Sequence, residues 1–321
     1  MARTISQEPA MHAAVVRSFT HPPRYEEFPT PEGEHVVDVL AAALHPRVRS
    51  TADGTHYEST GELPLIPGID GVGRTAGGEH VYFVLPDTLL GSMAERAAVD
   101  PRRCAVLPAH VDPVTIAAAM NPAMSSWIAL RRRIAFEPGQ SVLVLGATGN
   151  AGQLAVQIAK HLGAKQVIAA GRNEARLAEL EAIGADRTVV LDDTEALGAA
   201  AAEVDVVLDY LWGSAAAAAI PAILTRRPDR GRPLTWVEIG SMAGLELPVQ
   251  SQWLRAARLQ LVGSGQGSVP TREIVAELSE LAAHIAQGGY TIDASPVVLS
   301  DVEDAWTRSL GSSERVVFVP A

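Results

Sequence analysis

The pattern of apolar and polar residues divides the chain into a part typical of β-structure and a part typical of alternating strands and helices. Before residue 112, short apolar runs such as 11–18, 35–44 and 80–86 are separated by segments rich in proline and glycine. These runs predict strands joined by turns, with irregular structure over 22–31 and 47–63. From 113 to 134, apolar residues recur at helical spacing, and we expect two helices separated by a turn at Asn121 and Pro122.

The stretch after residue 140 has the alternation expected of a parallel sheet covered by helices. Apolar runs there predict strands at 141–145, 165–170, 187–191, 205–210, 234–239 and 259–262. The segments between them have helical spacing, and parallel strands with helices on both faces form a doubly wound α/β sheet. The remainder predicts a helix over 271–287 and a tail with strands at 291–299 and 315–319. The tail is too short to fold alone, so we expect it to complete the first part.

The turn after the first of these strands carries the clearest chemical signal. Gly146, Gly149 and Gly152 lie between an apolar strand and an amphipathic helix, in the sequence GATGNAG. Glycine at 149 leaves the backbone open to a pyrophosphate, and glycine at 152 allows helix and strand to pack closely. The first N–H groups of the helix are free to bind anionic oxygens. Strand, turn, helix and strand in this order predict a dinucleotide site, although Ala147 occupies the first motif position.

The end of the second strand indicates which dinucleotide is bound. The strand is followed by Gly171, Arg172 and Asn173, with Arg176 one turn into the next helix. An acidic residue there would accept a hydrogen bond from the ribose 2′-hydroxyl of NADH, whereas an arginine pairs with a 2′-phosphate. The sequence therefore favours NADPH. The alternative is a surface arginine beside a glycine turn that binds nothing.

Composition and charge narrow the class of protein. The chain has 321 residues, of which 47% are hydrophobic and 20% charged, and its net charge is −11. A negative balance argues against nucleic acid and anionic membranes as partners. No apolar run is long enough to span a bilayer, and the opening residues lack a signal pattern, so we expect a cytoplasmic protein. The single cysteine excludes an internal disulfide.

Motifs along nearly the whole chain resemble those of the medium-chain dehydrogenase/reductase superfamily. They are PGIDGVG at 67–73, GSMAE at 91–95, MSSWIAL at 124–130 and the glycine turn, which is similar to that of the quinone oxidoreductase branch. The resemblance implies a Rossmann-type doubly wound parallel sheet over 123–266. This sheet would be inserted in a mostly-β GroES-like catalytic domain made of 1–122 and 267–321.

The resemblance also implies that this chain holds no zinc. The zinc-dependent members place their ligands at positions that correspond here to His45, Ile69 and Asn121. A catalytic zinc needs three protein ligands, and only His45 is a plausible one. In the zinc-free branch, NADPH reduces quinones or enone and enoyl double bonds, so we expect a small electrophilic substrate.

Site residues follow from the resemblance and from the rule that ligands bind at the carboxyl ends of parallel strands. We expect catalytic roles for His45, Tyr57 and Ser125, although His45 and Tyr57 could equally be ordinary packed or surface residues and Ser125 a helix cap. Besides the glycines and basic residues above, the expected cofactor contacts are Asn121, Thr148, Asn150, Ala151, Tyr210, Leu211, Ile239, Gly240, Ser241, Gly265 and Gln266.

Two other interpretations stay open. The glycine turn also resembles that of atypical short-chain reductases, but those proteins place it at the N-terminus and commonly use Tyr-x-x-x-Lys, which is absent here. A non-catalytic NADPH-binding redox sensor is the other, because a fold does not determine function. The strand at 259–262 would be a free sheet edge, which relatives pair across a two-fold axis, so we expect a homodimer.

Overall fold

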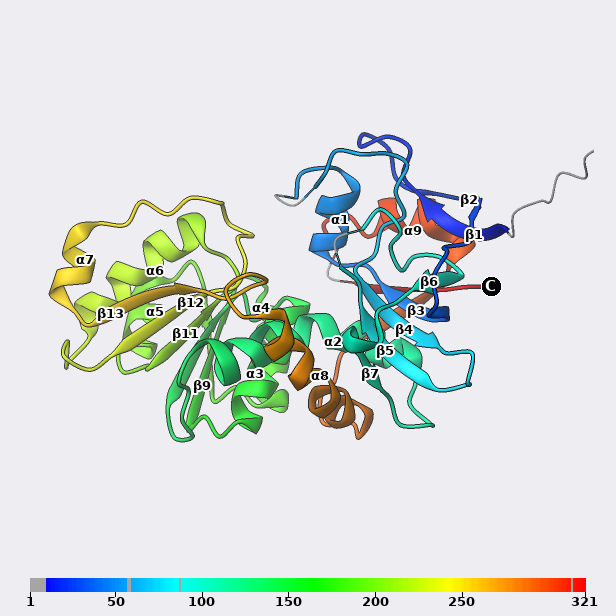
Figure 1. Ribbon diagram of the computed structural model, residues 1–321. Helices are drawn as coiled ribbons and strands as arrows, with labels where there is room; N and C mark the ends of the chain where they lie inside the picture. Colours follow the sequence, from blue (N-terminus) through cyan, green and yellow to red (C-terminus); the bar gives the residue numbers. More distant parts are fainter. Residues whose placement is uncertain (1–9, 57–58, 87, 313) are drawn as a thin grey trace, which may run out of the picture. The chain divides into compact units, whose positions relative to one another are not determined.

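The chain forms two compact units. The computed structural model describes residues 10–56, 59–86, 88–312 and 314–321 (Figure 1). One unit comprises Met1–Asn121 with Leu278–Ala321, and the other comprises Pro122–Glu277. The helices α2 (Pro113–Ile128) and α8 (Thr271–Ala286) each contain one of the divisions. Residues 267–277, which the sequence placed with the first part, therefore fall in the second unit.

The second unit contains the predicted doubly wound sheet, and this prediction is confirmed. Its strands are β8 (Ser141–Leu145), β9 (Gln166–Gly171), β10 (Arg187–Val190), β11 (Val206–Asp209), β12 (Leu234–Glu238) and β13 (Leu259–Gly263). They are all parallel and lie in the order β10-β9-β8-β11-β12-β13. The order reverses direction between β8 and β11, and such a switch point opens a crevice at the carboxyl ends of the strands.

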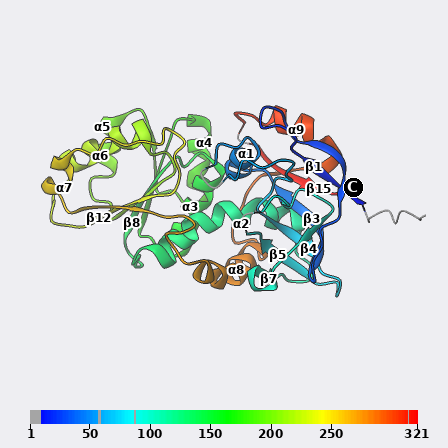
Figure 2. The same ribbon diagram turned by 45° about the horizontal axis from the view of Figure 1, so that its top comes forward.

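Helices cover both faces of this sheet, as Figures 1 and 2 show. The helices are α3 (Asn150–His161), α4 (Glu174–Glu179), α5 (Thr194–Ala200), α6 (Gly213–Arg226) and α7 (Ser251–Ala256), with a 3-10 turn at Leu180–Ile183 and a π-helical turn at Ala129–Arg133. One face packs α5, α6 and α7 around a core that includes Leu143, Ile220 and Trp236. Because both faces are covered, the strands are apolar throughout rather than alternating.

The first unit is built mainly from antiparallel sheet. Its larger sheet runs in the order β14-β15-β3-β4-β5-β7, with β6 also paired to β3, and β1 pairs with β2 separately. The strands are β1 (Ala10–Val15), β2 (Arg24–Pro29), β3 (Val36–Ala43), β4 (Asp70–Arg74), β5 (His80–Val84), β6 (Arg96–Ala98), β7 (Cys104–Val106), β14 (Ala294–Val298) and β15 (Arg315–Val319). The helices are α1 (Pro46–Ala52) and α9 (Val302–Arg308), with 3-10 turns at Pro101–Arg103 and Leu299–Asp301.

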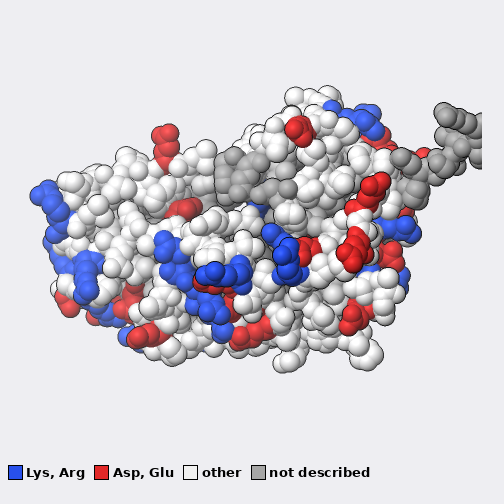
Figure 3. Space-filling model, in the orientation of Figure 1, with Lys and Arg blue, Asp and Glu red and all other residues white. Residues whose placement is uncertain are grey.

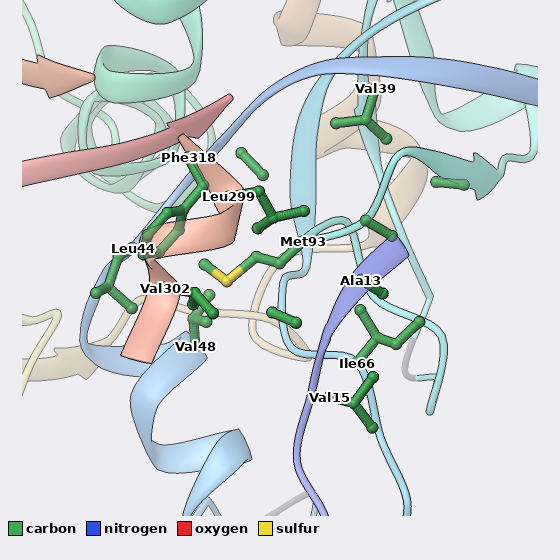
Figure 4. Close-up of a cluster of buried hydrophobic side chains, with 14 of the residues drawn as sticks. Ala13, Val15, Val39, Leu44, Val48, Ile66, Met93, Leu299, Val302 and Phe318 are labelled. Carbon is green, nitrogen blue, oxygen red and sulfur yellow. The ribbon is translucent and has the colours of Figure 1, made fainter. Parts of the chain in front are cut away.

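The core of the first unit joins the beginning of the chain to its end, as expected for the tail. In Figure 4, Met93 lies among side chains from both parts, including Leu299, Val302 and Phe318 of the tail. The tail strand β15 pairs antiparallel with β3 through Phe318 and Ala42. The tail is therefore an integral part of this unit.

Several elements of the first unit were missed in the sequence, among them β4 and β6, which lie at the PGIDGVG motif and directly after the GSMAE motif. Residues 24–29 form β2 rather than a turn, and their side chains are largely exposed, so the apolar signal is weak. Residues 46–52 form α1 within the segment expected to be irregular; Pro46 occupies its first turn, where a proline costs no hydrogen bond.

The expected turn at Asn121 and Pro122 is also wrong, because α2 continues through it. A proline inside a helix leaves the carbonyl four residues earlier without its N–H partner. Here that carbonyl belongs to Ala118, and it accepts a hydrogen bond from Nε of Arg315 at 2.9 Å. A side chain from the far end of the chain thus replaces the missing backbone donor.

Two further features are the length of the helices and the distribution of charge on the surface. None of the helices in the described part combines the length and apolarity that crossing a bilayer requires. On the face shown in Figure 3, basic and acidic side chains lie close together among large uncharged areas.

Candidate functional site

The glycine turn of the second unit has the backbone geometry of an anion-binding loop. Gly146 has φ of +84°, in the region that favours glycine. A Cβ on Gly152 would overlap the carbonyl oxygen of Gly146, so only glycine fits there. Gly149 is the N-cap of α3, and the N–H groups of the first turn of this helix lack intrahelical acceptors. These groups and the helix dipole favour an anion at this position.

The neighbouring strand end supports this turn from the side. A Cβ on Gly171 would lie 2.6 Å from the methyl group of Thr148, so the absence of a side chain lets the two segments approach. Nη1 of Arg176 donates to the carbonyl oxygen of Thr148 at 2.8 Å. Asn173 caps α4 by accepting from the N–H of Arg176 at 3.1 Å. Arg176, predicted as a cofactor contact, therefore holds the turn at Thr148, and Asn173, also predicted, fixes the start of α4, which carries Arg176.

A cavity of about 500 Å³ opens beside Arg172. Its polar lining residues are Arg172, Asp192, Thr194 and Ser214, and its apolar ones include Leu191, Leu211 and Met242. Of these residues, Arg172 and Leu211 were predicted from the sequence as cofactor contacts. The others follow β10, begin α6 or follow β12, so the rule that ligands bind at the carboxyl ends of strands would have found them.

A buried aspartate shapes the turn that carries Leu211 into this cavity. Asp209 is fully buried, and its Oδ1 accepts from the N–H groups of Leu211 and Trp212 at 2.8 and 2.9 Å. Its Oδ2 accepts from Nε1 of Trp236 at 2.8 Å. Burial raises the pKa of this carboxyl group, and the three donors oppose that effect. Trp212 has φ of 52°, a strained value that these bonds help to hold.

Tyr210 connects the end of β11 to α2. Its hydroxyl lies 3.0 Å from Oγ of Ser125, which donates to the carbonyl oxygen of Pro122 at 2.6 Å. Burial raises the pKa of Tyr210 to about 12, so the phenol stays protonated at neutral pH. Ser125 lies inside α2, so the alternative that it caps a helix is wrong. Its expected catalytic role stays a prediction.

The remaining residues of the second unit that the sequence predicts as cofactor contacts lie in loops or at a helix start. Ile239, Gly240 and Ser241 follow β12, and a Cβ on Gly240 would lie 3.2 Å from the carbonyl oxygen of Tyr210. The N–H of Gly265 donates to Oγ of Ser268 at 2.8 Å, and Gln266 forms an isolated bridge with Val269. Asn150 and Ala151 form the first turn of α3.

In the first unit, His45 belongs to a buried polar cluster. Its Nε2 lies 3.3 Å from Oδ1 of Asp70, whose Oδ2 accepts from the hydroxyl of Tyr82 at 2.6 Å. Burial lowers the pKa of His45, although Asp70 opposes the shift, so the imidazole is neutral at neutral pH. Asn121 is in this unit as well. Tyr57 lies outside the described residues.

The residues of this cluster do not fit a catalytic zinc. Ile69 stands where the second ligand would be, and it packs against the hydrophobic core. The ring of His45 is hydrogen-bonded to Asp70, and Asn121 is a weak ligand for zinc. Among the described residues, no three His, Cys, Asp or Glu side chains are grouped so as to hold a metal ion.

Comparisons with known proteins agree with this architecture. A family described as zinc-binding dehydrogenase matches residues 151–283. A probable NADPH-dependent quinone reductase of Emericella nidulans is 31% identical, over 97% of this chain and all of that protein. An NADPH-dependent alkenal/one oxidoreductase of Arabidopsis thaliana is 30% identical over 49% of this chain and 45% of its own length.

Among solved structures, the quinone oxidoreductase of Thermus thermophilus, also described in complex with NADPH, superposes with a TM-score of 0.79. It is 25% identical and covers 96% of this chain and 100% of its own. These likenesses do not favour the short-chain interpretation of the glycine turn. Full-length similarity, strand order and glycine turn together show that the chain belongs to the quinone oxidoreductase-like branch of the medium-chain dehydrogenase/reductase family.

Proposed function

We propose that the protein is an NADPH-dependent oxidoreductase that reduces quinones or activated carbon–carbon double bonds without zinc. The observation that carries the proposal is the placement of Arg172. It lines a cavity and directly follows Gly171, which packs against Thr148 of the glycine turn, at the end of a strand that carries no carboxylate there. The relatives named above as NADPH-dependent quinone and alkenal/one reductases support the same reaction.

The residues present fit the adenosine diphosphate part of NADPH. The N–H groups after Gly149 receive the diphosphate, and the guanidinium of Arg172 pairs with the 2′-phosphate. The rest of the dinucleotide would bind at the carboxyl ends of β11 and β12, the next strands along the sheet from β8. Tyr210 and Leu211 follow β11, and residues 239–241 follow β12. Bound NADPH supplies the reducing equivalent, and the chain supplies binding, orientation and a polar partner for the substrate oxygen.

His45 is the residue of the first unit that we propose for this last role. Asp70 takes the single N–H of this neutral ring, so the other ring nitrogen is an acceptor and can pair with the hydroxyl group that forms when a quinone is reduced. Tyr57 and Ser125 are the candidates for a proton donor. Zinc independence follows from the ligand positions, and we expect less than about 0.1 zinc per chain by elemental analysis and no loss of activity with a chelator.

We also propose that the protein is a homodimer. The edge strand β13 pairs only with β12 among the described residues, and a free edge invites pairing with a second copy. Elution as a monomer at micromolar concentration would contradict this. The cytoplasmic location expected from the sequence also stays a prediction.

The test of the function is oxidation of NADPH, followed by its absorbance, with a panel of quinones and enones. We expect turnover with NADPH to exceed turnover with NADH. Arg172→Asp should raise KM for NADPH about 100-fold or more, because a charge-assisted pair is replaced by repulsion, and should affect NADH little. The control for the change in charge is Arg187→Asp. Arg187 is exposed and is the first residue of β10, so it lies at the edge of the sheet opposite the carboxyl ends of the strands, where Arg172 lies.

Three results would count against the proposal in different ways. Equal losses for both coenzymes in Arg172→Asp would remove the 2′-phosphate role. Tight binding of NADPH without turnover of any substrate would favour the non-catalytic sensor. Stoichiometric zinc that is required for activity would overturn the zinc-free reaction.

A further inference from the structure

The cavity beside Arg172 contains a second charge of opposite sign. Asp192 follows β10 and lines the same cavity as Arg172. Among the described residues, the two side chains form no ion pair with each other, and the carboxylate of Asp192 has no hydrogen-bond donor. A 2′-phosphate would satisfy the guanidinium but would be repelled by the carboxylate. Both side chains are exposed, so water solvates them in the free protein, and a ligand in this cavity meets an acceptor as well as a site for a phosphate.

The order of the strands indicates which part of the ligand meets each charge. The glycine turn follows β8, Arg172 follows β9 and Asp192 follows β10, and these strands are neighbours in that order. Adjacent strands are about 4.8 Å apart, so the three groups are spaced along one edge of the sheet. An adenosine diphosphate has the same order of parts: diphosphate, ribose and base. With the diphosphate at the turn and the ribose phosphate at Arg172, the base reaches Asp192.

The rest of the lining suits a flat purine with a polar edge. Leu191, Leu211, Ala218 and Met242 supply apolar surface, and aromatic bases bind well between such side chains. The edge of adenine carries one exocyclic amino group, which is a hydrogen-bond donor. A carboxylate is an acceptor only, so it pairs with an amino group and repels a carbonyl oxygen at the same position.

We propose that Asp192 is a specificity residue that recognises the exocyclic amino group of the adenine ring. The inference rests on the proposed function, since it assumes that an adenine dinucleotide occupies the cavity. It assigns to Asp192 a role separate from that of Arg172, which recognises the phosphate. In this arrangement Arg172 selects the nucleotide by its phosphate, and Asp192 selects it by its base.

The test compares binding of NADP⁺ with binding of its hypoxanthine analogue, in which a carbonyl oxygen replaces the amino group. Dissociation constants are measured by calorimetry on the full chain. We expect the wild type to bind NADP⁺ about 10-fold tighter than the analogue, because the analogue leaves a charged acceptor unpaired. In Asp192→Ala this ratio should fall to about 2 or less. Glu195→Ala is the matched control, because Glu195 is 82% exposed, lies nearby on α5 and does not line the cavity.

The ratio separates this proposal from other effects of the same substitution. Removing a negative charge strengthens binding of both nucleotides equally, because both carry the same phosphates. A hydrogen bond from Asp192 to a ribose hydroxyl would also affect both equally. A ratio near 1 in the wild type, or one unchanged in Asp192→Ala, overturns the role of Asp192 and leaves the proposed function intact. Absence of binding of either nucleotide to the wild type overturns the proposed function.

Discussion

At the scale of single residues, the three glycines of the turn have different physical roles. Gly152 has no space for a Cβ, because the carbonyl oxygen of Gly146 occupies it. Gly149 has space, since a Cβ there would lie 3.5 Å from the same oxygen, an ordinary contact. The protein itself therefore does not require glycine at 149. A ligand placed over the turn would.

This difference gives a matched pair of substitutions. Gly152→Ala should lower the free energy of unfolding by about 2 kcal/mol or more, because backbone atoms must move. Gly149→Ala should cost less than about 1 kcal/mol but weaken NADPH binding at least about 10-fold, since the methyl group intrudes on the diphosphate. Urea unfolding and calorimetric titration measure the two effects. Undiminished binding in Gly149→Ala would show that no diphosphate lies there.

Cys104 is a residue whose reactivity the fold reduces. Burial raises its pKa to about 11 from the ordinary value of 9.0, and its Sγ donates to the carbonyl oxygen of Asp100. Only the thiolate is alkylated, so at pH 8 the native protein should react with iodoacetamide about 100-fold more slowly than the chain unfolded in urea. The rate should still be rising at about pH 10. Equal rates in the two states would contradict the burial of this thiol.

At the scale of elements, α2 shows how a distant side chain permits a local irregularity. Pro122 removes one helical hydrogen bond, and Arg315 from β15 supplies a donor to the Ala118 carbonyl. The same guanidinium donates to the carbonyl oxygen of Leu44, which directly follows β3. Burial lowers the pKa of Arg315 to about 10. One buried side chain thus connects three elements of the first unit.

A double-mutant cycle tests this replacement of a backbone donor. Arg315→Met should lower the free energy of unfolding by about 3 kcal/mol, because buried carbonyl groups lose their donor. Pro122→Ala restores an N–H to the helix, so the loss in Arg315→Met should be smaller by about 1 kcal/mol in that background. Exposed Arg308→Met serves as the control. Strict additivity of the two substitutions in urea unfolding would contradict the coupling.

At the scale of the whole molecule, the adenosine half of the proposed cofactor concerns the second unit alone. The glycine turn, Arg172 and the cavity all lie within Pro122–Glu277. Four of the five tryptophans, Trp127, Trp212, Trp236 and Trp253, belong to that unit as well. Tryptophan fluorescence therefore reports mainly on the unfolding of the second unit.

We expect NADP⁺ to stabilise this unit by mass action. At a concentration about 100 times Kd it should add about 2.7 kcal/mol and raise the midpoint of the fluorescence transition by about 5 °C. NAD⁺ at the same concentration should raise it much less, because it lacks the 2′-phosphate. Thermal scans of wild type and Arg172→Asp measure both shifts. An equal response to the two nucleotides would contradict the selectivity assigned to Arg172.

The local sequence pattern was sufficient to predict those features that depend only on residues close together in the chain. The strands of the doubly wound sheet are buried on both faces and form apolar runs, and the glycine turn is identified by its spacing between strand and helix. Arg172 could be selected because it directly follows a predicted strand. The surface strand β2 and the short helix α1 were missed, since neither has an apolar periodicity that distinguishes it from a loop.

The sequence by itself therefore determined the doubly wound sheet, the glycine turn and the basic residue beside it, because their signals lie within a few residues of each other. Only the tertiary structure decided that Asp192 shares a cavity with Arg172, and that Arg315 completes a helix 197 residues earlier. Such pairings depend on strand order and on the return of the tail. Periodicity along the chain carries no information about either.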